Sequence, residues 1–372
     1  MFIQAKKKIL FMGQFPPPVH GVSSMNSYIL NSTTLSEYID FDKISINTAD
    51  RLDRIDKFSL AKLYEVFKNV LIMIKLISRT KYAFAYFTVN LKGLAFYRDM
   101  LYAAVIKCFG LKRLYHLHGY GVALASKSRV KRHLYRWYFK DAKVITLGEV
   151  IYKDIAMFVK RENVFVLYNA VPLSVDEGEI ESIIALRRKK NKFGILFLSN
   201  MMESKGPHIL LEVGSLLKSK GRIFNIYFAG AWMDNSYRKF FIKAIADYGL
   251  NENVILEGFC SGDKKKELLS KSDIFVFPTL RDTLSLVVLE AMEYALPILA
   301  SNEGAIPEVV REGKEGFICP KHDIKYIAEI IEYLIEHKER RLEIGNNARN
   351  HFLENFSFDK YENKLLEIFQ KD

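Results

Sequence analysis

The chain has 372 residues, enough for two domains with separate cores, because a single hydrophobic core stops growing near roughly 250 to 300 residues. Apolar residues make up 49% and charged residues 26%, which excludes a disordered or fibrous protein. The net charge of +12 is uneven: residues 1–175 carry 27 Lys and Arg against 12 Asp and Glu, and residues 176–372 carry 28 against 31. The first half is therefore expected to face something anionic, which could be a membrane surface, a phosphorylated acceptor or nucleic acid.

Cysteine usage and the N-terminus predict a cytoplasmic protein. The three cysteines are odd in number and show no CxxC spacing, so neither a disulfide framework nor a zinc knuckle is indicated. The basic segment Met1–Lys8 runs into a strand-like segment without the apolar stretch of a signal peptide. The most apolar helical segment, Val66–Ile77, is interrupted by lysines and too short to span a bilayer. We expect at most a peripheral location on the inner face of the cell membrane.

The first half alternates short apolar runs with amphipathic stretches, which indicates βα units around a parallel sheet. Strands are expected at Lys8–Met12, Phe41–Ile46, Ala83–Thr88, Arg113–His118 and Ala142–Thr146. Helices are expected at Ser24–Leu30, Leu60–Ile77, Ala95–Phe109, Lys127–Phe139 and Val150–Phe158.

The second half repeats this pattern after a charged stretch, Pro172–Lys192, which has little apolar periodicity and is interpreted as a connection between domains. The expected strands are Gly194–Leu198, Phe224–Ala229, Val254–Glu257, Ile274–Phe277, Ile298–Ala300 and Gly316–Ile318. A last helix, Asp359–Gln370, carries one apolar face.

The predicted fold class is therefore α/β, with two facing Rossmann-like domains, each a doubly wound parallel sheet. The first domain is expected to span residues 1–172 and the second 173–354, with the C-terminal helix 355–372 packing back on the first. Ligands bind at the carboxyl ends of strands in such sheets, so two sheets provide two crevices. This arrangement suits a reaction that joins two separate molecules.

The segment from Phe277 to Met292 indicates strand, loop and helix, with Asp282 where the helix begins and Glu290 about two turns along it. At 1.5 Å per residue the two carboxylates are up to roughly 12 Å apart, so they cannot share a proton. They can contact two ends of one elongated ligand, while free backbone N–H groups of Thr283, Leu284 and Ser285 point at an anion between them. The alternative is that Asp282 caps the helix and Glu290 is solvated.

This segment resembles the paired-carboxylate motif of retaining family-4 glycosyltransferases of the GT-B fold, Glu-x7-Glu-Ala-Met-x-x-Gly-x-Pro. The spacing, the Glu290-Ala-Met run and Pro297 match. Asp282 replaces the first glutamate, and Ala295 stands where glycine is usual. The resemblance implies that Asp282 contacts hydroxyls of the donor sugar and that Glu290 contacts the ribose hydroxyls of the nucleotide.

A second match follows the first strand of the second half, at Phe197-Leu-Ser-Asn200-Met-Met-Glu-Ser-Lys205-Gly206. The family usually has Arg five residues before a Lys-Gly pair, and both cations bind the diphosphate. Lys205 is retained here, whereas Asn200 occupies the arginine position and removes one bidentate phosphate contact. The alternative for Lys205 is an exposed loop lysine.

The first half carries Phe15-Pro-Pro-Pro-Val-His-Gly21-Val-Ser-Ser directly after its first strand, a stiff loop in which Ser23 or Ser24 can cap the next helix. It resembles the family's N-terminal glycine loop, with Gly21 reaching the donor phosphates; the alternative is a capped turn. His118 resembles the family histidine near the reacting centre. His116 lies on the same strand face, so the two could bind a metal, but no third ligand is evident and His116 is interpreted as structural.

Smaller matches complete the expected donor site: Gly230 after one strand, and Gly258 and Phe259, which by resemblance lie near the nucleotide base. No metal and no cofactor are expected, because Lys205, the Gly21 loop and the helix N-terminus after Asp282 are expected to meet the diphosphate charge; the acidic cluster at Asp50, Asp53 and Asp56 is interpreted as part of a surface loop. The segment Lys127–Lys140 alternates cations with aromatic residues, which suits either an interfacial helix or a core-packed helix with a solvated basic face.

The predicted function is transfer of a sugar, with retention, from a UDP-, GDP- or TDP-sugar to a glycan or lipid-linked sugar acceptor. The assigned catalytic residues are His118, Asp282 and Lys205. One alternative is a non-catalytic nucleotide-sugar or glycan binder with a decayed site, suggested by Asn200, Asp282 and Ala295. Nucleic acid is not an expected partner, because the chain carries no recognised nucleic-acid module.

Overall fold

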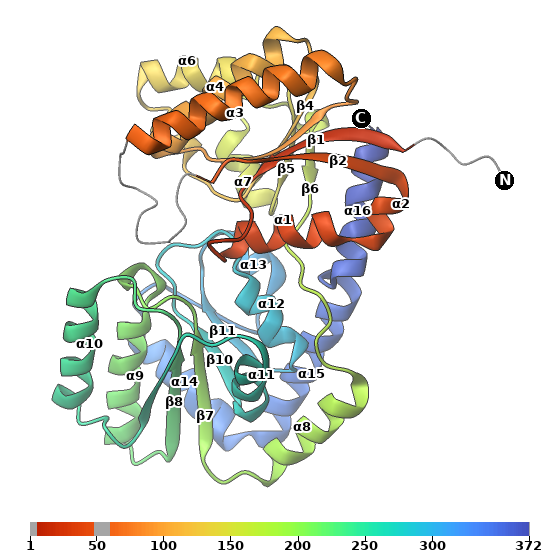
Figure 1. The fold of residues 1–372 in the computed structure, drawn as a ribbon. Helices are drawn as coiled ribbons and strands as arrows, with labels where there is room; N and C mark the ends of the chain where they lie inside the picture. Colours follow the sequence, from red (N-terminus) through yellow and green to blue (C-terminus); the bar gives the residue numbers. More distant parts are fainter. Residues whose placement is uncertain (1–5, 48–59, 372) are drawn as a thin grey trace. The chain divides into compact units, whose positions relative to one another are not determined.

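The computed structural model describes residues 6–47 and 60–371, and the acidic cluster at Asp50, Asp53 and Asp56 lies outside them. The chain divides into two compact units (Figure 1). The first unit comprises Met1–Asn169 and Phe358–Asp372, and the second comprises Ala170–Ser357. The last helix of the chain thus belongs to the first unit.

The first unit is a parallel sheet of six strands in the order β2-β1-β3-β4-β5-β6. Its strands are β1 (Lys7–Gly13), β2 (Ile39–Ser45), β3 (Ala85–Val89), β4 (Arg113–Leu117), β5 (Lys143–Thr146) and β6 (Val164–Val166). Its helices are α1 (Gly21–Asn31), α2 (Thr33–Tyr38), α3 (Leu60–Arg79), α4 (Gly93–Cys108), α5 (Val122–Ala125), α6 (Arg129–Phe139), α7 (Glu149–Ile155), the 3-10 turn η2 (Arg161–Asn163) and α16 (Phe358–Lys371).

Alternation along β1 shows why this sheet is covered on both faces. Leu10 and Met12 face a core shared with α3, α4 and α6. Phe11 faces the other way, where its ring contacts Tyr86, which in turn contacts Phe369 of α16. Because both faces bury apolar side chains, the strands read as continuous apolar runs, as expected for a parallel sheet with helices on either side.

The second unit is also a six-stranded parallel sheet, in the order β12-β11-β10-β7-β8-β9. Its strands are β7 (Phe193–Leu198), β8 (Phe224–Ala229), β9 (Val254–Gly258), β10 (Ile274–Phe277), β11 (Ile298–Ser301) and β12 (Gly316–Cys319). Its helices are α8 (Glu177–Lys189), η3 (Glu203–Lys205), α9 (Pro207–Ser219), α10 (Asn235–Asp247), α11 (Gly262–Lys271), α12 (Leu286–Glu293), α13 (Ile306–Val309), α14 (Ile324–Glu336) and α15 (Lys338–Asn355).

The stretch Pro172–Lys192, interpreted as a connection between domains, contains a helix that was not predicted, α8, at residues 177–189. Asp176 and Glu179 close the start of this helix in a reciprocal capping box. Arg187 is buried, and its guanidinium donates hydrogen bonds to the carbonyls of Tyr294 and Leu269 at 2.8 and 2.7 Å. A buried arginine anchors the helix in place of a broad apolar face, which is why apolar periodicity did not predict it.

Three short elements were also missed: α2, α5 and β6. Each has six residues or fewer, too short for a periodic pattern to identify. The boundaries of the other elements predicted by residue range differ by at most three residues, as for α1, which begins at Gly21 rather than Ser24. His20, not a serine, is its N-cap, with Ser23 closing a capping box.

Helix α6 is the core-packed alternative of the two that the sequence left open. Tyr135, Tyr138 and Phe139 are buried and join the aromatic core beside Phe96. Trp137 remains partly exposed, with the Lys107 ammonium over its ring at 3.9 Å. The aromatic residues of α6 are thus mostly withdrawn from any external surface. Within residues 6–47 and 60–371, no helix is both long and apolar enough to cross a membrane.

Candidate functional site

The central point of the second sheet lies between β7 and β10, which pair in parallel although about 80 positions separate them in the chain. From β7 the chain adds β8 and β9 on one side, then returns to add β10, β11 and β12 on the other. The carboxyl ends of two such strands diverge into loops that leave a crevice. The loops after β7 and β10 are therefore the expected ligand site of this unit.

These two loops contact each other directly. The Ser204 carbonyl accepts hydrogen bonds from the backbone N–H groups of Leu280 at 2.9 Å and Arg281 at 3.2 Å. Gly206 has a φ of +74°, and a Cβ at this position would lie 2.0 Å from the Pro278 carbonyl oxygen. Glycine is required here on both counts, because it allows the left-handed backbone and the close approach of the neighbouring loop.

Lys205 and Asp282 lie on these two loops and form an ion pair of 2.6 Å between Nζ and Oδ2. Both side chains are mostly buried. The other carboxylate oxygen of Asp282, Oδ1, accepts the backbone N–H of Thr283 at 2.8 Å. The structure thus brings together two of the three predicted catalytic residues and gives the carboxylate two donors of its own.

The helix after Asp282 starts later than predicted. Helix α12 begins at Leu286 with Ser285 as its N-cap, so Asp282 is not the cap and Glu290 lies little more than one turn inside the helix. The Thr283 N–H is also not free for an anion, since it bonds to Asp282. The physical reason is a local turn: an aspartate can accept its neighbour's N–H and delay the helix. Leu284 is buried, and Ser285 makes no side-chain cap hydrogen bond.

Glu290 is paired rather than solvated. Its Oε1 accepts Lys265 Nζ of α11 at 2.7 Å. Its Oε2 is buried and accepts no hydrogen bond from the described residues. A buried carboxylate oxygen without a donor is costly, and a bound hydroxyl would relieve that cost. Lys265 was not predicted, although the Lys264-Lys265-Lys266 run just after Phe259 is a visible signal.

Two further predicted residues, Asn200 and Gly230, lie where β7 and β8 end. Gly230 N–H donates to the Gly258 carbonyl at 2.7 Å, and a Cβ on Gly230 would lie 1.7 Å from the Ser199 carbonyl oxygen. Asn200 follows Ser199 and is half-buried. Gly230 therefore lies in close contact with the backbones of Ser199 and Gly258. This close backbone packing explains why glycine occupies the position.

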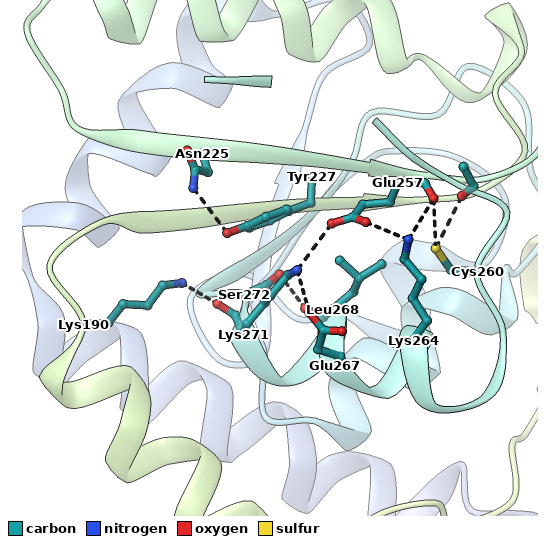
Figure 2. Close-up of polar contacts among 11 residues, drawn as sticks. Lys190, Asn225, Tyr227, Glu257, Cys260, Lys264, Glu267, Leu268, Lys271 and Ser272 are labelled. Atoms are coloured by element: carbon teal, nitrogen blue, oxygen red, sulfur yellow. Dashed lines mark hydrogen bonds and ion pairs between the residues drawn. The ribbon is translucent and has the colours of Figure 1, made fainter. Parts of the chain in front are cut away.

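Charged side chains fix the connection that carries Gly258 and Phe259. Figure 2 shows Glu257 between Lys264 and Lys271, with Nζ–Oε distances of 3.0 and 3.3 Å. Partial burial acts to raise the pKa of Glu257, but the two lysines hold it below its usual range. Gly258 follows with a φ of +70°, and the Phe259 ring is 69% exposed. The ion pairs of Glu257 thus hold the segment that presents the exposed Phe259 ring.

Ala295, the second departure from the family motif, adopts a φ of +51° directly after α12. This left-handed conformation is common for glycine at a helix end and unfavourable for alanine. The positive φ therefore explains why the family usually has glycine at this position. Alanine in its place strains the local backbone. It does not touch the carboxylates.

In the first unit, Gly21 lies at the end of the loop that joins β1 to α1. Gly21 is the first residue of α1, and a Cβ there would meet no atom within 4 Å. The expected close approach of backbone is thus not needed for packing within this unit. Asn26 of α1 holds the start of the loop, since its Nδ2 donates to the Gln14 carbonyl at 2.8 Å.

His118 follows β4 and its ring is tilted against that of His116, with ring centroids 4.2 Å apart. Burial, and then the proximity of His20, lower the pKa of His118 to about 3, so its imidazole is neutral at physiological pH. His116 is buried, and its Nδ1 lies 2.6 Å from the Tyr86 hydroxyl, in agreement with a structural role. Among the described residues no group of three His, Cys, Asp or Glu could hold a metal ion.

Asp154 is a residue that the sequence did not single out. Its carboxylate accepts the N–H groups of Gly121, Val122 and Ala123 at 2.6, 2.8 and 3.0 Å. It therefore occupies the N-terminus of α5 and fixes the loop that begins at His118. Its position 33 residues downstream of Gly121 explains why no local pattern reveals it.

Comparison with known proteins places these observations in context. Residues 179–351 match the family model for glycosyl transferases group 1. The chain is 33% identical over 172 residues to the capsular polysaccharide biosynthesis glycosyltransferase CapM of Staphylococcus aureus, covering 45% of this chain and 43% of CapM. The chain spans about half the length of the curated relatives it matches.

Two solved structures share the fold. A glycosyltransferase from Rickettsia africae ESF-5 has a TM-score of 0.78 at 18% identity and covers 99% of both chains. Anabaena Alr3699/HepE, solved in complex with UDP-glucose, has a TM-score of 0.74 at 18% identity over 98% of this chain and 100% of that chain. The two parallel sheets with flanking helices are the GT-B fold, as predicted.

Proposed function

We propose that the protein transfers a sugar from a nucleotide-diphosphate sugar to a glycan or lipid-linked sugar acceptor, with retention of anomeric configuration. The observation that carries this proposal is the pair of carboxylates held by lysines, Asp282 with Lys205 and Glu290 with Lys265, beside the carboxyl ends of strands in the second unit. They lie within the segment that matches glycosyl transferases group 1, and HepE of the same fold was solved with UDP-glucose.

In the proposed donor complex, Glu290 Oε2 accepts a ribose hydroxyl, which supplies the donor that this buried atom lacks. The exposed Phe259 ring stacks on the base. Lys205 binds the diphosphate and stabilises its charge as the bond between the anomeric carbon and the phosphate oxygen breaks. The acceptor hydroxyl oxygen bonds to the anomeric carbon from the same face, and its proton passes to the leaving phosphate. Asp282, released from Lys205 in part, then accepts hydrogen bonds from hydroxyls of the sugar.

The first unit contributes His118 and the Gly21 loop in this proposal, with the roles that the family resemblance implies. The low pKa of His118 limits its chemistry: a neutral imidazole can donate or accept one hydrogen bond, but it brings no positive charge. Compensation of the diphosphate charge is therefore assigned to Lys205 and to backbone N–H groups. The donor requires no metal in this scheme.

The proposal is tested first by a binding panel of UDP, GDP and TDP followed by calorimetry. Glu290→Ala should weaken the nucleotide that binds best, and Asp282→Ala should leave its affinity nearly unchanged while abolishing transfer. Glu267→Ala is the matched control, because Glu267 is an exposed carboxylate of α11 that pairs with Lys271. Equal nucleotide affinity in wild type and Glu290→Ala would refute the proposal that Glu290 binds a ribose hydroxyl.

A second measurement separates an enzyme from a sugar-nucleotide binder. Slow hydrolysis of the matching donor sugar, detected by release of the free nucleotide, should occur in wild type and disappear in Asp282→Ala. Binding without any turnover, with every tested donor and with glycan acceptors present, would contradict catalysis.

A further inference from the structure

Helix α3 carries an exposed apolar side in addition to the apolar side that packs on the core. One side packs on the core of the first unit through the buried Met73 and the partly buried Val66, Val70, Leu76 and Ile77. The other side is exposed and carries Leu60, Leu63, Tyr64, Phe67, Leu71 and Ile74. At 100° per residue these six side chains fall within about 100° of arc, so they form one continuous stripe. A surface helix normally presents polar residues on this side.

Helix α4 adds to the exposed apolar surface. It packs beside α3 (Figure 1). Its Leu94, Tyr97 and Leu101 are exposed at i, i+3 and i+7. With Ile72, these two helices hold ten of the 27 large apolar side chains exposed among residues 6–47 and 60–371. Single exposed apolar residues need no explanation, but a concentration of this kind marks an interaction site. We call these ten residues the α3–α4 patch.

Positive charge lies along one edge of the α3 stripe, between the stripe and Ile72. Lys68, Lys75 and Arg79 are exposed on the side of α3 next to the stripe, and Glu65, which pairs with Lys68, is the one acidic residue of the helix. They belong to a half of the chain that carries 27 Lys and Arg against 12 Asp and Glu. An apolar stripe with a basic border is the composition of a helix that lies in a lipid interface.

We propose that the α3–α4 patch is a docking surface for a membrane leaflet that contains anionic lipids. The stripe would enter the boundary between headgroups and acyl chains, and Lys68, Lys75 and Arg79 would lie at the level of the headgroup phosphates. A second copy of the chain fits less well, because a symmetric contact would bring the two sets of cations together. The proposal moves the membrane contact from α6, whose aromatic residues are mostly buried, to α3.

Flotation with vesicles tests this proposal, using the full chain with phosphatidylcholine alone and with added phosphatidylglycerol. Wild type should float with the anionic vesicles, and high salt should weaken but not abolish the binding. Phe67→Gln with Leu71→Gln should reduce the bound fraction on the order of tenfold or more, because two exposed apolar side chains no longer enter the lipid. Both residues are more than 60% exposed, and glutamine is a good helix former, so folding should be retained.

The matched control is Leu186→Gln with Phe240→Gln, which removes two equally exposed apolar side chains from helices of the second unit and should float like wild type. Lys68→Gln with Lys75→Gln should lose mainly the salt-sensitive part of the binding. Flotation of Phe67→Gln/Leu71→Gln equal to wild type would overturn the proposal. The proposal would also be overturned if wild type sedimented as a dimer and this variant as a monomer, because the patch would then be a contact between two copies of the chain. None of these readouts requires sugar transfer, so they fail independently of the proposed function.

Discussion

Gly206→Ala tests whether the contact between the loops after β7 and β10 supports the candidate site. Two effects add at this position. The backbone φ of +74° costs an alanine roughly 1 to 2 kcal/mol. The new Cβ would also lie 2.0 Å from the Pro278 carbonyl oxygen, so the loop that leads to Asp282 must move by about 1 Å to reach a tolerable 3.0 Å. Such forced backbone shifts cost typically about 1 to 3 kcal/mol.

Gly221→Ala separates the two effects, because Gly221 has a similar φ of +72° and open space around its Cβ position. We expect roughly 1 to 2 kcal/mol of destabilisation for Gly221→Ala and roughly 2 to 5 kcal/mol for Gly206→Ala. Only Gly206→Ala should also weaken nucleotide binding, because only that change displaces the neighbouring Lys205, which binds the diphosphate in the proposed complex.

Urea unfolding followed by tryptophan fluorescence provides the measurement. The chain has two tryptophans, and a Trp137→Phe background leaves Trp232, which bridges to Met201 in the loop after β7, as the reporter of the second unit. If Gly206→Ala destabilises this unit no more than Gly221→Ala does, the close approach of Pro278 does not matter and the argument is refuted.

Four other predictions follow from the site. The pKa of His118 is lowered to about 3, whereas its value in the unfolded chain is near 6.5, so only the unfolded chain takes up this proton and stability should fall as pH drops below about 6.5. His118→Gln should remove about 1.4 kcal/mol per pH unit of that fall. Identical urea stabilities of wild type and variant from pH 7 to pH 5 would contradict this prediction. Lys205→Met should weaken the nucleoside diphosphate about 10- to 100-fold in calorimetry but leave the nucleoside unchanged, and an equal loss for both would remove the phosphate role. Ala295→Gly should stabilise the second unit by roughly 0.5 kcal/mol in urea, because relief of the strain at a φ of +51° is partly offset by loss of the buried Ala295 methyl group. Ala291→Gly inside α12 should destabilise the unit. Transfer should survive excess EDTA, and loss of activity that magnesium or manganese restores would assign the diphosphate to a metal.

The fold class could be predicted from the sequence, because a fold class depends on periodic patterns of apolar residues. One helix and the order of the strands in the two sheets could not be predicted in this way. Strands buried on both faces appear as apolar runs in the sequence, so β1, β3 and β10 were located to within a few residues. Helix α8 was missed because its anchors, the Asp176 capping box and the Arg187 contacts with distant carbonyls, are not apolar. Strand order was not predicted either, since pairing of β7 with β10 depends on tertiary packing.

The same division applies to the candidate site. The spacing of Asp282 and Glu290 is local and was visible in the sequence, and its meaning came from a family resemblance. The cations that hold them were not visible as partners: Lys205 is 77 residues from Asp282 and Lys265 is 25 residues from Glu290. Those pairs exist only once the sheet has placed the loops together. The Thr283 N–H contact with Asp282 is local, but it competes with helix initiation, and sequence alone did not decide between them.

Helix α16 has a consequence for how the protein is made. It is synthesised after the entire second unit, yet Tyr361, Leu365 and Phe369 are buried in the first unit, and Glu362 accepts the hydroxyls of Ser32 and Thr34 at 2.5 and 2.7 Å. During translation, the face of the first unit's sheet that α16 covers therefore stays uncovered until α16 has been synthesised. Until the ribosome releases residues 358–371, Phe11, Phe84 and Tyr86 lack their partner Phe369 or the contacts built on it, and this exposed aromatic face is where chaperones would be expected to act on the nascent chain.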